Sequence, residues 1–213
     1  MSRTSGAAES SELHASAVIS LTTGIRTEEA RALRWDHVVA WIPNLKQWRS
    51  VTEVRFKHKK FAIYVWRADR EGGDTKTRKS RRTLELPKLA AEALRQHHVS
   101  QAANKLRAGE AWQDHNLVFC TSVGTQLDAS NVRRAFRKIT KEAGIGTAWS
   151  PRELRHSFVS IMSDQGVPIE TIADLVGHAG TSVTEAVYRH QLRPVITKGA
   201  QTMNTIFGDS QHG

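Results

Sequence analysis

The chain has 213 residues, and 31 lysines and arginines against 21 aspartates and glutamates give it a net charge of +10 at pH 7. This length suits one domain with a substantial core, and so basic a chain favours a polyanionic partner such as nucleic acid. No apolar run of about 18 residues and no signal-peptide pattern occurs, so we expect no membrane span and a cytoplasmic protein. The single cysteine, Cys120, cannot form a disulfide within the chain and is expected to be buried.

The N-terminal third begins with helical signals. Residues 1–12 are small and polar without a hydrophobic period, which predicts a flexible leader. The apolar residues of 13–21 recur on one helical face, and Gly24 follows them as a stop signal. A second helix is expected to open at Thr27, with two glutamates in its first turn. Arg26 therefore lies between two helices.

The residue pattern changes between residues 51 and 86, where short runs of β-branched or aromatic residues appear. These runs are "VTEVRF" (51–56), "FAIYVW" (61–66) and "RTLEL" (82–86). The segment between the last two, "REGGDTKTRKS", is rich in turn residues and in lysine and arginine. Together they predict a small antiparallel sheet with a basic hairpin tip.

Helical signals return after Pro87, first over 88–106 and then over 129–144. The second of these helices carries an apolar stripe made of Val132, Ala135, Phe136, Ile139 and Ala143. Most of its cations fall off the stripe, among them Arg133, Arg134, Arg137 and Lys138. They form either an ordinary solvated face or a surface that contacts DNA phosphates.

Three further helices are expected toward the C-terminus. Ser150 and Pro151 open the first, which Gly166 closes, and Pro168 opens the second. The third, "TSVTEAVYRH", contains Tyr188. The predicted fold class is therefore mainly α with a small antiparallel β-sheet (α+β).

Four stretches, taken together and in this order, carry a resemblance. They are "TTGIRTEEARALRW", "TKTRKSRRTLELP", "SPRELRHSF" and "LVGHAGTSVTEAVYRH". They resemble the catalytic domain of the tyrosine recombinases, the phage-integrase family. The resemblance spans residues 13–190 and rests on the order and spacing of the motifs, since each motif alone is weak. It implies the tyrosine recombinase catalytic-domain fold and a site-specific DNA recombinase that forms a 3′-phosphotyrosine intermediate, without metal or cofactor.

The resemblance also implies roles for particular residues. The catalytic set is Arg26, Lys76, Arg152, Arg155, His178 and Tyr188, with Glu29 and His156 in support. Guanidinium groups suit the negative charge that develops on a phosphodiester under attack. Tyr188 would be the nucleophile, Lys76 the general acid for the leaving 5′ oxygen, and Glu29 would orient Arg26 or its helix.

Arg152 departs from the family pattern, which most often has a histidine three residues before the second arginine. An arginine, with a pKa above about 12, cannot accept the tyrosine proton as a histidine can. Its charge would still favour the tyrosinate form and add a cation at the phosphate. The identity of the proton acceptor is therefore left open by the sequence.

Each of these residues also has an ordinary structural interpretation. Tyr188 alone would be a half-buried packing residue, and Arg155 an ion-pair partner of Glu153. His178, after a glycine, would satisfy a carbonyl at a helix end, and Lys76 would be solvated. The ten histidines include no HExxH motif, so no metal site is expected. Only the joint arrangement favours the recombinase.

The resemblance implies duplex DNA as partner, with a tetrameric synapse on DNA and accessory DNA-bending or directionality factors. Arg78 and Lys79 of the hairpin join the four cations of 129–144 as expected DNA contacts. We expect a catalytic domain over 13–192 and a tail over 193–213 that packs on its own domain or on a neighbouring protomer. The family's N-terminal core-binding domain is expected to be absent. The source would be bacterial or phage-encoded, and the protein nucleoid-associated.

Two alternatives of other kinds remain. One is a DNA-binding regulator that keeps the fold but has weak or no catalysis, for which Arg152 is the sequence hint. The other is a type IB topoisomerase-like enzyme that relaxes supercoils by the same tyrosine chemistry. The short length and the integrase-like motif spacing argue against the topoisomerase.

Overall fold

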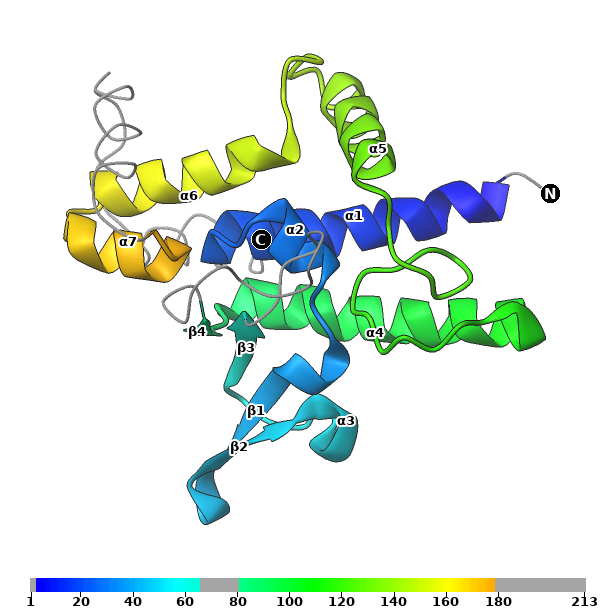
Figure 1. The fold of residues 1–213 in the computed structure, drawn as a ribbon, viewed down its shortest axis with the longest axis horizontal. Coiled ribbons are helices and arrows are strands. Elements are labelled where there is room, and N and C mark those ends of the chain that lie inside the picture. Colours follow the sequence, from blue (N-terminus) through cyan, green and yellow to red (C-terminus); the bar gives the residue numbers. More distant parts are fainter. Residues whose placement is uncertain (1–2, 66–80, 179–213) are drawn as a thin grey trace, which may run out of the picture.

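The computed structural model describes residues 3–65 and 81–178, and of residues 3–12 only the backbone. Within these residues the chain is mostly helical, with one four-stranded antiparallel sheet below the helices in Figure 1. The predicted fold class is confirmed. The expected helix around Tyr188, the hairpin tip with Lys76, Arg78 and Lys79, and the tail all lie outside the described residues.

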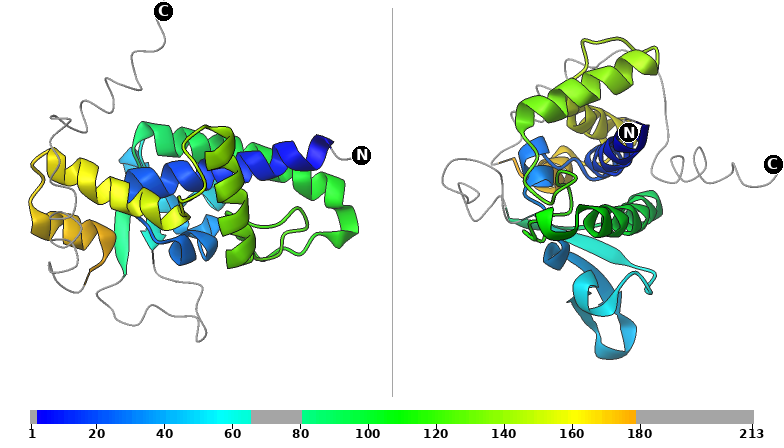
Figure 2. Two further views of the ribbon diagram at one scale, coloured as in Figure 1. Left: turned by 90° about the horizontal axis from the view of Figure 1, so that it is seen from above. Right: turned by 90° about the vertical axis from the view of Figure 1, so that its right-hand side faces the viewer.

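Helix α1 (Arg3–Thr23) runs through the middle of the helical part, with α4 (Lys88–Ala108) on one side and α6 (Pro151–Asp164) on the other (Figures 1 and 2). Ala15 and Ile19, one turn apart, are fully buried on it. The helix begins about ten residues earlier than the sequence indicates, within the expected leader. Alanine and glutamate there are good helix formers, and lengthening an existing helix costs little.

The sheet contains four strands in the order β2-β1-β3-β4, and every neighbouring pair is antiparallel. The strands are β1 (Val38–Ile42), β2 (Gln47–Ser50), β3 (Phe61–Val65) and β4 (Arg82–Glu85). Strands β3 and β4 coincide with two of the predicted runs. In β4 and beyond, burial alternates, so that Leu84 and Leu86 face the core and Glu85 faces solvent.

The prediction of a strand over 51–56 is wrong. Val51–Val54 form a one-turn helix, α3, whose first turn is capped by Ser50, because the Ser50 hydroxyl accepts a hydrogen bond from the Thr52 backbone N–H at 3.2 Å. The chain leaves α3 through Arg55, which has a positive φ of 59°. Local capping outweighs β-propensity here, which depends strongly on context. Strands β1 and β2 were not predicted.

Two clusters of buried side chains hold the elements together. The larger lies between α1, the sheet and α4, and includes Ile19, Ile63 and Leu94. The smaller joins α6 to α7 (Ile169–Val176) through Phe158 and Ile172, among others. Leu175 packs against both clusters. Helix α7 is therefore fixed to the main core as well as to α6.

The remaining elements of the described residues are helices and 3-10 turns. They are α2 (Thr27–Arg31), α5 (Ala129–Glu142) and the 3-10 turns Trp35–His37, Pro43–Leu45 and Gly109–Ala111. Helix α2 begins at Thr27, as predicted. Only part of the predicted stripe on α5 is buried, since Val132 and Phe136 are covered but Ile139 is 36% exposed.

Cys120 is buried, as expected, and its sulfur accepts a hydrogen bond from the Gln101 side-chain amide at 3.0 Å. None of the helices in the described part of the chain is long and apolar enough to span a membrane. Across the same residues, no group of three or more histidine, cysteine, aspartate or glutamate side chains is placed to hold a metal ion.

Candidate active site

The turn between α1 and α2 places Arg26. Gly24 ends α1 with a φ of +68°, and a Cβ atom there would lie 2.5 Å from the ring of Phe158, so α6 packs directly on this turn. Arg26 follows in an extended conformation and caps α2. Its backbone N–H donates to one oxygen of Glu29 at 2.7 Å, and its Nη1 donates to the other at 2.8 Å. Glu29 thus holds both the backbone and the side chain of Arg26.

Arg155 approaches the same turn from α6. Its side chain is buried, and it donates from Nη1 to the carbonyl of Gly24 at 2.5 Å and from Nη2 to the carbonyl of Val176 at 2.6 Å. The alternative that Arg155 pairs with Glu153 is wrong, because Glu153 contacts His156 Nδ1 at 3.1 Å instead. The buried guanidinium therefore bridges the α1–α2 turn and the end of α7.

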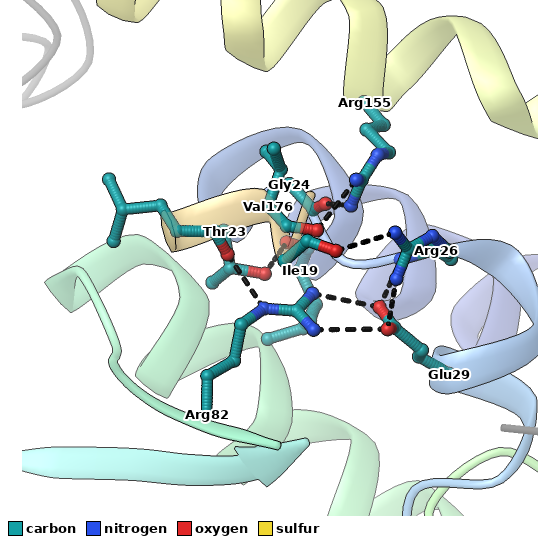
Figure 3. A network of polar contacts seen from close by, with 10 residues as sticks. Ile19, Thr23, Gly24, Arg26, Glu29, Arg82, Arg155 and Val176 are labelled. Atoms are coloured by element: carbon teal, nitrogen blue, oxygen red, sulfur yellow. Dashed lines mark hydrogen bonds and ion pairs between the residues drawn. The ribbon is translucent and has the colours of Figure 1, made fainter. Parts of the chain in front are cut away.

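The C-terminal end of α7 receives three arginine side chains on three successive carbonyls (Figure 3). The hydrogen bonds are Arg82 Nε to Leu175 at 2.7 Å, Arg155 Nη2 to Val176 at 2.6 Å and Arg26 Nη2 to Gly177 at 2.9 Å. A helix C-terminus has unpaired carbonyls and a partial negative charge, so cations there are favourable. His178 follows immediately, with its backbone N–H bonded to the carbonyl of Ala173 at 2.9 Å. Three guanidinium groups from distant parts of the chain thus gather beside His178.

Arg82 was not singled out by the sequence analysis. Both of its terminal nitrogens donate to Glu29, at 3.0 and 2.8 Å, and the two side chains are only 8% and 1% exposed. A signal was available, because Arg82 lies two residues before the inward-facing Leu84 of the same strand and so shares its face. Period-2 patterning would have placed this arginine on the buried face.

The charges at this site follow from burial and from the crowding of cations. Burial alone would raise the pKa of Glu29, but hydrogen bonds and charges from Arg82 and Arg26 lower it below its ordinary value. Burial, followed by the charge of Arg26, lowers the pKa of Arg155 to about 9, which leaves it protonated at neutral pH. Burial, then Arg155, Arg26 and Arg82, lower the pKa of His178 to about 4. His178 is therefore neutral at pH 7, with one ring N–H to donate.

Two predicted residues of α6 lie outside this network. Arg152 is exposed in the first turn and makes no hydrogen bond or ion pair with other residues that the structure describes. His156 is half-buried and contacts Glu153. The catalytic role of Arg152 and the supporting role of His156 stay predictions.

The cations predicted on α5 are all exposed. They are Arg133, Arg134, Arg137 and Lys138. Arg133 donates to the Ser130 hydroxyl at 2.9 Å, and Lys138 lies 4.0 Å from Glu142. Exposed pairs of this kind contribute little to stability, so these side chains remain available to a partner.

A hollow of about 790 Å³ lies between α5, α1 and α4, lined by Leu13, Arg31, Phe119 and Val132 among others. Neither the arginines that meet at the end of α7 nor Glu29 line it. The converging charged groups of the candidate site therefore lie outside this hollow, at the end of α7.

Comparison with known proteins places the chain in a family. The profile of the "Phage integrase family" matches residues 4–193. The chain belongs to this family of tyrosine recombinases. An "Integrase" of Streptomyces ambofaciens is 56% identical to it over 203 residues, which are 94% of this chain and 50% of the relative. A "Tyrosine recombinase XerC-like" protein of Caldanaerobacter subterraneus subsp. tengcongensis is 27% identical, over 89% of this chain and 48% of the relative.

Solved structures show the same fold for this integrase-family chain. The XerH site-specific recombinase, in a pre-cleavage complex with its difH substrate, matches with a TM-score of 0.62 at 17% identity, over 86% of this chain and 44% of XerH. The XerA recombinase matches with a TM-score of 0.58 at 17% identity, over 100% of this chain and 63% of XerA. The chain spans about half the length of the curated relatives it matches. The predicted family and catalytic-domain fold are confirmed.

Proposed function

We propose that this chain is the catalytic domain of a site-specific recombinase, which cleaves and rejoins duplex DNA through a 3′-phosphotyrosine. Family membership and the 56% identity to an integrase support this function. One observation carries it. Arg26 and Arg155 come from segments far apart in the sequence, and both donate to the backbone beside His178. Such converging donors suit a phosphodiester, whose nonbridging oxygens gain negative charge under attack.

The described groups fit distinct parts of this chemistry. The Arg26 side chain is 27% exposed, so a phosphate can reach it, while Glu29 keeps the guanidinium oriented. Arg155 uses two of its N–H groups on carbonyls, and a guanidinium has further donors to offer a phosphate. His178 is neutral at pH 7 and offers a ring N–H without adding charge.

Two further groups enter the proposal from the sequence motifs. The phenol oxygen of Tyr188 attacks phosphorus, so that an O–P bond to tyrosine forms while the bond from phosphorus to the 5′ oxygen breaks. Lys76 gives a proton to that leaving oxygen. The phenol proton passes to solvent water, because Arg152 cannot take it, and the proposed contribution of Arg152 is a positive charge that favours the phenolate. Because the ester conserves the bond energy, the strand is rejoined without a nucleotide cofactor.

The proposal extends to binding. The four exposed cations of α5, with Arg78 and Lys79 of the hairpin, contact phosphates of duplex DNA. The recombinase acts as a tetramer on DNA, assisted by DNA-bending or directionality factors. In support, the XerH structure is a complex of a recombinase with its DNA substrate. The segment 13–192 is the proposed catalytic unit.

Covalent trapping tests the function. The protein is incubated with sheared genomic DNA of its source organism and denatured with detergent, and protein-linked DNA is isolated. The chain contains two tyrosines, so Tyr64→Phe is a matched control for Tyr188→Phe. We expect an adduct with the wild type and with Tyr64→Phe and none with Tyr188→Phe.

Two other outcomes contradict the proposal. The first is salt-dependent DNA binding without any adduct. If the Arg152→His variant also forms no adduct, the chain is a non-catalytic regulator. Relaxation of supercoiled plasmid at any sequence, with no joined strands from paired sites, would indicate a topoisomerase. Sequencing of the trapped DNA supplies the recombination site for the experiment below.

A further inference from the structure

Arg82 holds two parts of the candidate site at once. All three of its side-chain nitrogens donate, Nη1 and Nη2 to the two oxygens of Glu29 and Nε to the carbonyl of Leu175 at 2.7 Å. Figure 3 shows the guanidinium lying between Glu29 and the end of α7. A planar guanidinium that donates on two edges fixes the relative orientation of its acceptors, which a lysine cannot do.

Glu29 is shared between the two arginines in a regular way. Its Oε1 accepts from Nη1 of Arg26 and Nη1 of Arg82, and its Oε2 accepts from the backbone N–H of Arg26 and Nη2 of Arg82. Each carboxylate oxygen has room for about two donors, so these four fill the group. The plane of the carboxylate is thus set by Arg82, and the carboxylate in turn sets the Arg26 side chain.

The contact with α7 is equally close. Gly177 ends the helix with a φ of +66°, and a Cβ atom there would lie 2.9 Å from Nη1 of Arg82. The α7 backbone therefore rests directly on the guanidinium, and His178 is the next residue. Arg82 follows Lys76 by six positions, at the start of the strand that leaves the hairpin.

We propose that Arg82 is a positioning residue, which aligns Arg26 through Glu29 and aligns His178 through the end of α7. Its side chain is 8% exposed and its nitrogens face protein acceptors, so it acts through its neighbours rather than on the phosphate. The catalytic meaning of this role rests on the proposed function. The alignment itself does not, because it is a property of the folded chain.

The test compares Arg82→Met and Arg82→Lys with Arg81→Met, which removes the exposed neighbouring arginine. Urea and thermal unfolding first identify a temperature at which every variant is folded. At that temperature we measure the affinity for a 40-base-pair duplex carrying the trapped site and the rate of adduct formation at saturating duplex. Amide hydrogen exchange of Gly177 and His178 is followed without DNA.

We expect both Arg82 variants to bind DNA like the wild type but to form the adduct about 100-fold more slowly, the scale on which a small misplacement reduces a rate. Their Gly177 and His178 amides exchange faster with solvent. Arg81→Met changes neither the rate of adduct formation nor the amide exchange. If Arg82→Met does not fold, Arg82→Lys decides.

A wild-type rate and unchanged exchange in folded Arg82→Lys would overturn the proposal. So would a loss of rate that only follows the unfolded fraction and disappears on cooling. If the wild type itself forms no adduct, the proposed function fails, and the amide exchange still decides whether Arg82 positions the end of α7.

Discussion

Arg155 donates a hydrogen bond of 2.5 Å to the carbonyl of Gly24, and this contact joins α6 to the turn that presents Arg26. The same guanidinium holds the carbonyl of Val176 at 2.6 Å. An arginine expected to bind phosphate is therefore also a structural tie between three elements. Substitutions of Arg155 will affect folding and chemistry together, and the two effects need separate measurements.

The stability effect of Arg155 can be measured without DNA. Arg155→Lys keeps a positive charge but cannot hold both carbonyls, and a buried hydrogen bond to a charged group is worth about 1.5–3 kcal/mol. We expect the free energy of unfolding in urea to fall by about this amount. Arg152→Lys, at an exposed position of the same helix, should change it by less than about 0.5 kcal/mol. Equal effects of the two substitutions would show that the carbonyl contacts contribute nothing.

The close approach of α6 to the first turn predicts a large effect of Gly24→Ala. The added Cβ would meet Phe158 Cδ1 at 2.5 Å and Val176 Cγ1 at 2.9 Å, on a residue that already has a positive φ. Strain and overpacking together should cost about 2–4 kcal/mol of unfolding free energy. Gly144→Ala is the matched control, because its φ is +75° but nothing lies within 4 Å of the added atom. It should cost about 1 kcal/mol, and a similar loss at both positions would contradict the packing argument.

His178 predicts a defined pH dependence of stability. Its pKa is about 4 in the folded chain, against an ordinary value of 6.5. Between these pH values the unfolded chain binds a proton that the folded chain does not, so stability falls as the pH drops from 6.5 toward 4. Burial also lowers the pKa of His97, which therefore contributes to the same pH dependence. The wild type is compared with His178→Asn, in which only part of the loss of stability between pH 6.5 and 4 should remain. If NMR shows that the imidazole of His178 titrates near pH 6.5 in the folded chain, the prediction is wrong.

The exposed cations of α5 predict a change in the salt dependence of DNA binding. Each phosphate contact contributes about 0.9 to the slope of log K against log salt concentration. Replacing Arg133, Arg134, Arg137 and Lys138 by glutamine should therefore reduce the slope by about 0.9 for every cation that touches DNA. A control variant with the same charge change replaces the exposed Lys88, Arg95, Lys105 and Arg107 of α4. Equal slopes for the two variants would show that α5 acts only through net charge.

Local signals in the sequence identified several elements correctly because their causes are local. The start of α2 at Thr27 and the first residue of α6, Pro151, follow from residues within one turn of each helix end. The segment 51–54 failed for a related reason. The cap by Ser50 favours a helix in this β-branched run, and hydrophobic periodicity alone does not take such a cap into account.

The partners of the site residues could not be predicted in the same way. The ordinary alternative for Arg155 was an ion pair with the neighbouring Glu153, but the acceptors of its side chain lie 131 and 21 residues away. Glu29 was expected beside Arg26, three residues away, yet its second arginine is 53 residues along the chain. Patterning marks Arg82 as inward-facing, and only the folded structure shows that its side chain meets Glu29 of α2 and the carbonyl of Leu175 in α7.

The three arginines at the end of α7 also have a consequence for how the chain acquires its site during synthesis. The contacts of Arg26, Arg155 and Arg82 with the region of α1 and α7 span 151, 131 and 93 residues of sequence. Contacts of such long range form late, after the intervening chain has collapsed. A ribosome-bound chain has already released Arg26 and Arg82 long before α7 emerges, so its guanidinium groups are not yet aligned. The three guanidinium groups are therefore brought together only when nearly the whole domain has folded.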